Sequence, residues 1–129
     1  MRAKDRLSPL EWEIMEVIWQ LGGAPSVREV LERAYPRGEK AYTTIQTVMN
    51  HLEDKGFLRK KKIGLVNFYR PVKKRTEMVR RETDRFVQNV FGGSFQALAG
   101  YLIQSDSLSE AEITDLKRLI ETKARERGE

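Results

Sequence analysis

The stretch from residue 41 to residue 56 constrains the fold more than any other part of the chain. Its apolar side chains recur at the spacing of one face of an α-helix. Gly56 follows as a residue type that commonly ends helices. The sequence therefore predicts an amphipathic helix here, with one face in a protein core. That face consists of Ile45, Val48, Met49 and Leu52.

The opposite face of this helix is polar but carries no charge before Glu53. A solvated face would normally carry Lys and Glu in a chain of which 33% is charged. Short hydroxyl and amide side chains suit hydrogen bonds to base edges and phosphate oxygens. The alternative, a merely solvated face, accounts less well for the basic segment that follows. The candidate base-reading residues are Thr43, Thr44, Gln46, Thr47, Asn50 and His51.

A basic hairpin is predicted directly after the helix, with strands over residues 57–63 and 66–72 and a turn at Gly64. We interpret its cations as contacts to DNA phosphates. A charged edge that keeps an exposed strand from pairing is the alternative. The candidate backbone-contacting residues, in the hairpin and before it, are Ser26, Arg28, Tyr42, Lys55, Arg59, Lys60, Lys61, Lys62 and Arg70.

Helix starts are marked by Ser-x-x-Glu patterns, in which the two side chains satisfy each other's backbone amides. The three pairs are Ser8–Glu11, Ser26–Glu29 and Ser109–Glu112. Thr43 with Gln46 is predicted to form a fourth, although that helix could start one residue to either side. The helix start at Ser26, with Arg28, suits a phosphate, and an ordinary capped helix explains it equally well. Two short helices, a longer one and a hairpin predict a winged helix-turn-helix domain over residues 1–72.

Charge supports a polyanionic partner for this first part of the chain. The net charge is +5 and the isoelectric point is about 9.6. Residues 1–72 hold 13 Lys and Arg against 9 Asp and Glu, whereas residues 73–129 hold 11 against 10. The sequence therefore predicts double-stranded DNA as the partner of the first part. The second part, in which positive and negative charges nearly cancel, is predicted to be an interaction module.

Several function classes find no support in the sequence. The chain has no Cys and one His, so we expect no disulfide, no metal site and no cofactor. It shows no nucleophile motif and no Gly-rich phosphate loop, so we expect no enzyme. It also has no apolar run of about 18 residues and no signal peptide, which predicts a cytoplasmic protein without a membrane partner.

The second part, residues 73–129, predicts three helices that cannot bury their apolar stripes alone. These stripes must pack on the first part or on another chain. We expect a second copy of the chain to cover them. A two-fold dimer would place two recognition helices on a palindromic operator, about 34 Å apart. The candidate dimerisation residues are Val79, Phe86, Val90, Phe95, Leu98, Leu102, Ile103, Ile113, Leu116, Leu119 and Ile120.

Four segments together resemble the penicillinase-repressor family of bacterial transcription factors, over nearly the whole chain. They are Leu7–Met15, Val27–Val30, Thr43–Met49 followed by Leu52 and Lys55-Gly56, and Gly93–Phe95 with Leu98. The family includes regulators of β-lactamase and methicillin-resistance genes and a copper-responsive branch. The resemblance implies a fold that is mainly α with a small β-hairpin, namely a winged helix followed by a three-helix dimerisation arm. It also implies a homodimeric repressor that blocks transcription from an operator.

Two departures from the family separate this chain from its best-known branches. The copper branch carries a C-terminal cysteine cluster, which is absent here. The antibiotic-responsive members are induced by cleavage of an Asn-Phe bond in the arm, where this chain has Tyr101-Leu102. An inducing protease would therefore be of unknown identity. A winged helix that acts as a protein-interaction adaptor, without specific DNA binding, is the competing function.

Overall fold

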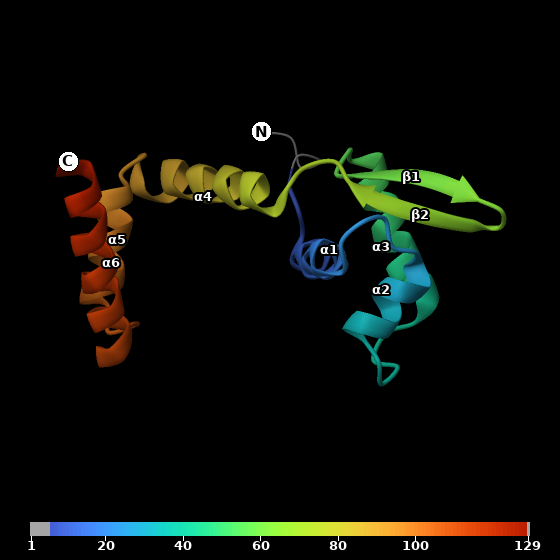
Figure 1. Ribbon diagram of the computed structural model, residues 1–129, viewed down its shortest axis with the longest axis horizontal. Helices are drawn as coiled ribbons and strands as arrows, with labels where there is room; N and C mark the ends of the chain where they lie inside the picture. The colour runs from blue at the N-terminus through green and yellow to red at the C-terminus, as the bar shows by residue number, and fades with distance from the viewer. Residues whose placement is uncertain (1–5, 129) are drawn as a thin grey trace. The chain divides into compact units, whose positions relative to one another are not determined.

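The computed structural model describes residues 6–128 and contains six helices and one antiparallel hairpin (Figure 1). This content confirms the predicted fold class. The predicted domains, 1–72 and 73–129, begin and end in residues 1–5 and 129, which lie outside the described part. The elements are α1 (Pro9–Leu21), α2 (Val27–Ala34), α3 (Tyr42–Asp54), β1 (Leu58–Ile63), β2 (Val66–Pro71), α4 (Arg75–Phe91), α5 (Phe95–Gln104) and α6 (Glu110–Gly128).

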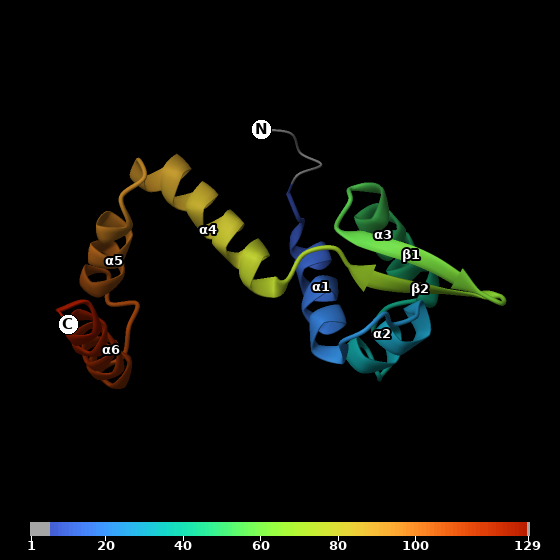
Figure 2. The same ribbon diagram turned by 45° about the horizontal axis from the view of Figure 1, so that its top comes forward.

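The described residues form two compact units, one reaching Glu82 and the other starting at Thr83, so helix α4 takes part in both. In the first unit, α1, α2 and α3 pack on one another, and the hairpin lies against α3 and α1. The turn of the hairpin projects past the helices in both views (Figures 1 and 2). The predicted domain boundary after residue 72 stays a prediction.

The core of the first unit joins every element that the sequence predicts for a winged helix. The predicted apolar face of α3 is buried through Ile45, Met49 and Leu52, each with no exposed area. These residues meet Ile14 and Ile18 of α1 in one cluster, which also includes residues of α2 and the hairpin. The other buried members are Leu7, Met15, Val27, Val30, Tyr35, Phe57, Leu58, Tyr69 and Met78. The uncharged face of α3 is thereby turned outward.

Three of the four predicted capping boxes are confirmed. In the pairs Ser8–Glu11, Ser26–Glu29 and Ser109–Glu112, the hydroxyl accepts from the Glu amide and the carboxylate accepts from the Ser amide. The predicted box of Thr43 and Gln46 is wrong. Helix α3 begins at Tyr42 after Ala41, which has no side-chain cap, so both residues lie inside the helix.

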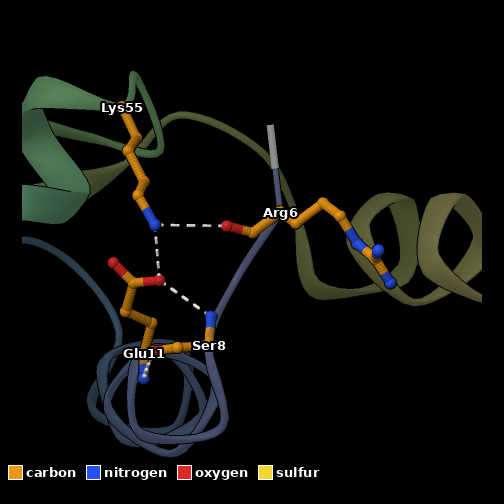
Figure 3. Close-up of polar contacts among 4 residues, drawn as sticks. All are labelled: Arg6, Ser8, Glu11 and Lys55. Atoms are coloured by element: carbon orange, nitrogen blue, oxygen red, sulfur yellow. Dashed lines mark hydrogen bonds and ion pairs between the residues drawn. The ribbon is translucent and has the colours of Figure 1, made fainter. Parts of the chain in front are cut away.

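One charged network ties the start of α1 to the end of α3 (Figure 3). The Lys55 ammonium donates to Glu11 Oε1 at 2.7 Å and to the Arg6 carbonyl at 3.2 Å. Burial alone would raise the pKa of Glu11. The hydrogen bonds from Lys55 and Ser8, with the Lys55 charge, outweigh burial and hold this pKa below its usual 4.5. Because the pKa is depressed, the network stabilises the fold above the ordinary pKa and is lost as pH falls through the lowered value.

We expect Glu11→Gln to remove this part of the pH dependence. Gln preserves the capping box but not the ion pair, so the free energy of unfolding at neutral pH should fall by roughly 1–3 kcal/mol. As the pH falls below the ordinary pKa of 4.5, the wild type should lose stability faster than the variant. Urea titration followed by tryptophan fluorescence measures both, because both Trp residues lie in α1. Parallel pH profiles would contradict the assignment.

The start of α4 belongs to the first unit through contacts with α1. The Trp19 indole donates to the Lys73 carbonyl at 3.1 Å, and Arg75 pairs with Glu16 at 2.7 Å. Met78 is fully buried in the core cluster. The stripe that the sequence predicts for this helix is less buried: Phe86 and Val90 are exposed in the single chain. Helix α4 therefore extends from the first unit with much of its apolar stripe uncovered.

The second unit buries little of its apolar surface within one chain. Aromatic contacts join Phe86, Phe91 and Tyr101 at centroid distances of 5.9 and 6.1 Å. An apolar groove between α5 and α6 is lined mainly by Ile103, Leu108, Ile113, Leu116 and Ile120. Of the predicted dimerisation residues, only Val79 and Leu98 are half-buried and the other nine are exposed. This unit therefore presents an uncovered apolar face.

Two further findings concern membrane spans and Asn-Phe bonds. Within residues 6–128, no helix is long and apolar enough to cross a membrane. The sequence does contain one Asn-Phe bond, Asn67-Phe68, and the structure places it in β2, paired with β1, rather than in the C-terminal helices.

Candidate nucleic-acid interface

The outward face of α3 is narrower than the sequence predicts. Thr43, Thr44, Thr47 and His51 are exposed, whereas Gln46 and Asn50 are half-buried. The half-buried pair lies toward the hairpin, since Gln46 shares a concave surface with Asn67 and Asn50 bonds to Tyr69. Four of the six candidate base-reading residues thus present their side chains freely, and two reach into the junction with the hairpin.

The hairpin is fixed beside α3 by backbone and side-chain contacts. The Tyr69 amide donates to the Pro25 carbonyl at 2.9 Å, and Phe68 forms an isolated bridge with Ser26, so β2 lies next to the start of α2. The Tyr69 hydroxyl donates to Asn50 Oδ1 at 2.7 Å. Burial, followed by the neighbouring Tyr42 and Glu53, raises the pKa of Tyr69, so the hydroxyl keeps its proton near neutral pH.

A concave surface opens where the starts of α2 and α3 meet the turn of the hairpin. The Arg28 guanidinium lies over the Tyr42 ring, 5.1 Å from its centroid. Ser26 is buried with its hydroxyl engaged in the α2 cap. Free amides at a helix start and a nearby guanidinium favour an anionic group such as a phosphate. The lining is completed by Val27, Gln46, Leu65, Val66, Asn67 and Tyr69.

The cations of the hairpin are divided between its two faces. Side chains alternate along a strand, and the register pairs Lys60 with Tyr69 and Arg59 with Arg70. Lys60 therefore lies on the side of α3, where its ammonium is 3.3 Å from Asn50 Oδ1. Arg59 and Arg70 lie on the other face, around the half-buried Phe68. By the same alternation, Lys62 lies on the first face and Lys61 on the second.

These hairpin cations are not neutralised by the protein. Within the described residues, Arg59, Lys61, Lys62 and Arg70 are exposed and make no ion pair. Like charges directly opposite each other, as in Arg59 and Arg70, destabilise a strand pair. A polyanion against this surface would relieve that repulsion. The pairing of Arg59 with Arg70 is therefore unfavourable in the isolated chain.

Lys55, which the sequence predicts to contact DNA phosphates, is engaged within the protein. Its ammonium is bound to Glu11 and to the Arg6 carbonyl (Figure 3). The sequence shows a cation at the end of the recognition helix but not its long-range partner. This network supports the first unit, and a contact between Lys55 and DNA stays a prediction.

Tyr69 is the main residue that sequence reasoning missed at this site. Its position opposite Lys60 follows from strand alternation, and a buried Tyr hydroxyl needs a polar partner. That signal could have indicated a contact with α3, although not the partner Asn50. No group of His, Cys, Asp and Glu that could hold a metal ion occurs within residues 6–128.

The chain is similar to known proteins over most of its length. The family model described as penicillinase repressor matches residues 7–122. The chain is 26% identical over 117 residues to the methicillin resistance regulatory protein MecI of Staphylococcus aureus strain N315, covering 91% of this chain and 94% of that protein. It is 26% identical over 121 residues to the penicillinase repressor of Bacillus licheniformis, covering 94% of each. The chain belongs to the penicillinase repressor family of transcriptional repressors.

Proposed function

We propose that the protein is a dimeric, sequence-specific DNA-binding repressor. It occupies a palindromic operator through α3 and the basic hairpin, which we call the wing (residues 58–71). The observation that carries the proposal is the exposed, uncharged face of α3 lying beside the unpaired cations of the wing. Family membership and the names of the relatives, which describe repressors, support the same role.

The proposal divides the contacts into two kinds. Thr43, Thr44, Thr47 and His51 are placed to read base edges in the major groove, with Gln46 at the margin of that face. Arg28, Tyr42, Ser26 and the wing cations hold the phosphates. A Thr methyl group suits the thymine methyl, and a Gln amide suits adenine. This division predicts different effects of substitutions in the two sets.

The uncovered apolar face of the second unit supports dimerisation. Phe86, Val90 and Phe95 are 48%, 59% and 53% exposed, and Ile120 is 62% exposed. A monomer rarely exposes so many large apolar side chains to water. A second copy provides an equally apolar partner, and its two-fold symmetry matches a palindromic operator. We therefore assign α4, α5 and α6 to the dimer interface.

Selection of bound fragments from the source genome tests the function. The full-length protein is mixed with sheared genomic DNA, and the enriched fragments are assayed by gel shift at two salt concentrations. A repressor gives a shared inverted repeat and an affinity that falls steeply with salt. An adaptor gives no enriched sequence, and that result would overturn the proposal. The gene next to the enriched site would also indicate the regulated process.

Thr47→Ala and Lys61→Ala should weaken binding in different ways. Loss of the Thr47 side chain should relax preference at one base pair, at a cost of about 1–3 kcal/mol for the preferred base. Loss of the Lys61 charge should weaken binding to all sequences alike and lower the salt slope by about 1. Titration of the selected operator, its single-base variants and unrelated DNA distinguishes these outcomes. Two silent substitutions would show that α3 and the wing are wrongly assigned.

A further inference from the structure

The junction between α3 and the wing contains a polar cluster whose geometry suggests a second role for a candidate base reader. Asn50 Oδ1 accepts a hydrogen bond from the Tyr69 hydroxyl at 2.7 Å and another from the Lys60 ammonium at 3.3 Å. Within the described residues, these are the side-chain hydrogen bonds that join α3 to the wing. One amide oxygen therefore receives both polar links between the two parts of the interface.

The Tyr69 end of this cluster is firmly held. Its side chain is 1% exposed within the core cluster, and its amide donates to the Pro25 carbonyl. A buried phenol hydroxyl needs an acceptor, and leaving it without one is costly. Asn50 supplies that acceptor. The position of the Asn50 side chain is therefore fixed by the wing as well as by its own helix.

This arrangement conflicts with reading adenine through Asn50. Bidentate recognition of adenine requires the amide oxygen as acceptor and the amide nitrogen as donor, both facing the base. An amide oxygen has two acceptor positions, and Tyr69 and Lys60 occupy both. Only the amide nitrogen remains for another partner. Base readout by this residue would require the bond to Tyr69 to break.

We propose that Asn50 is a positioning residue that couples the recognition helix to the wing. With Tyr69 and Lys60 it fixes how far the wing stands from α3, and hence which phosphates the wing meets when α3 is in the major groove. This role rests on the proposed DNA binding for its consequence, but the coupling itself is a property of the free protein. It removes Asn50 from the base-reading set.

The first test needs no DNA. Hydrogen–deuterium exchange of the wing amides is compared in full-length wild type, Asn50→Ala, Tyr69→Phe and His51→Ala. Tyr69→Phe keeps the buried ring and removes only the hydroxyl, and His51 is the exposed neighbour that serves as control. We expect the wing amides to exchange several-fold faster in Asn50→Ala and Tyr69→Phe than in the wild type. In His51→Ala they should exchange at the wild-type rate. Asn50→Asp keeps the acceptor oxygens and should retain wild-type protection. Unchanged wing exchange in both Asn50→Ala and Tyr69→Phe would refute the coupling.

The second test uses a double-mutant cycle on the selected operator. Asn50→Ala and Tyr69→Phe should each weaken binding about 3- to 10-fold, and the double variant should be no weaker than the worse single variant. The ranking of single-base operator variants should stay the same, while the salt slope falls by about 1 as a wing contact is lost. A purely structural role would leave that slope unchanged. If Asn50→Ala alters preference at one base pair while Tyr69→Phe is silent, Asn50 reads a base and the proposal fails.

The two tests separate this inference from the function on which it rests. Faster wing exchange in a protein that shows no sequence preference would leave the coupling in place and overturn the repressor proposal. Sequence-specific binding with unchanged wing exchange would support the repressor proposal and overturn the coupling.

Discussion

Ile120→Glu should convert the protein to a monomer and lower its operator affinity by about 100-fold or more. Ile120 is 62% exposed and lines the apolar groove between α5 and α6, so the substitution removes no core contact within one chain. In a dimer that covers this groove, each copy would bury an unpaired carboxylate. Separate monomers lose the high effective concentration that links two half-sites, which commonly contributes 10²- to 10⁴-fold. Sedimentation velocity and gel shift measure the two effects.

Thr122→Glu is the matched control for this substitution. Successive helical residues turn by about 100°, which places residue 122 on the opposite side of α6 from residue 120. The control should stay dimeric and bind the operator as the wild type does. Tryptophan fluorescence should be unchanged in both variants, because both Trp residues lie in α1 of the first unit. A wild type that stays monomeric at micromolar concentration, or an Ile120→Glu protein that stays dimeric, would contradict the assigned interface.

Local signals predicted most of the secondary structure because they act over three or four residues. Ser8 and Ser26 each cap a helix, and the Glu three positions later completes the box in the structure. Gly56 follows α3 with a φ of 86°, a conformation that suits Gly after a helix. The start of α3 was the exception. There Tyr42 enters the helix and lies against Arg28 of α2, so a contact between helices accompanies a start that no side chain caps.

Long-range partners were beyond the sequence pattern, and they decide the details of the site. Asn50 lies in α3 and Lys55 directly follows this helix, yet Lys55 is bound to Glu11 of α1 and Asn50 to Tyr69 of β2. Neither partner is within ten positions in the chain. The sequence could place a cation and an amide on the helix surface, but their pairing depends on how separate elements pack.

The stripe predicted for α4, Val79, Phe86 and Val90 with Met78 and Val87 beside them, shows a different limit. The residues with no exposed area are Met78 and Val87, whereas Phe86 and Val90 are exposed. Met78 is part of the core of the first unit, while Val87 belongs to the second. A single periodic stripe cannot describe a helix that packs in two units. The exposed stripe keeps its meaning as a candidate dimer surface, which stays a prediction.

Ile45→Ala should lower the free energy of unfolding of the first unit by about 2–5 kcal/mol. Ile45 has no exposed area and lies in the core cluster beneath the outward face of α3. The substitution removes buried methyl groups and leaves a cavity that the surrounding helices fill only in part. Since domains are stable by about 5–15 kcal/mol, the loss is a large share of the total. Urea denaturation followed by tryptophan fluorescence at one protein concentration measures this unit alone.

Ile63→Ala is the control, because Ile63 is 58% exposed at the end of β1 and its truncation should cost about 0.5 kcal/mol or less. The same pair links stability to function. Ile45→Ala should lose operator binding at a lower temperature than the control. The reason is that Thr43 and Thr47 face the DNA only while α3 is folded against the core. Excess operator should restore the folded state, since a ligand that binds only the folded protein stabilises it by mass action. An Ile45→Ala protein as stable as the control would show that α3 does not depend on this core.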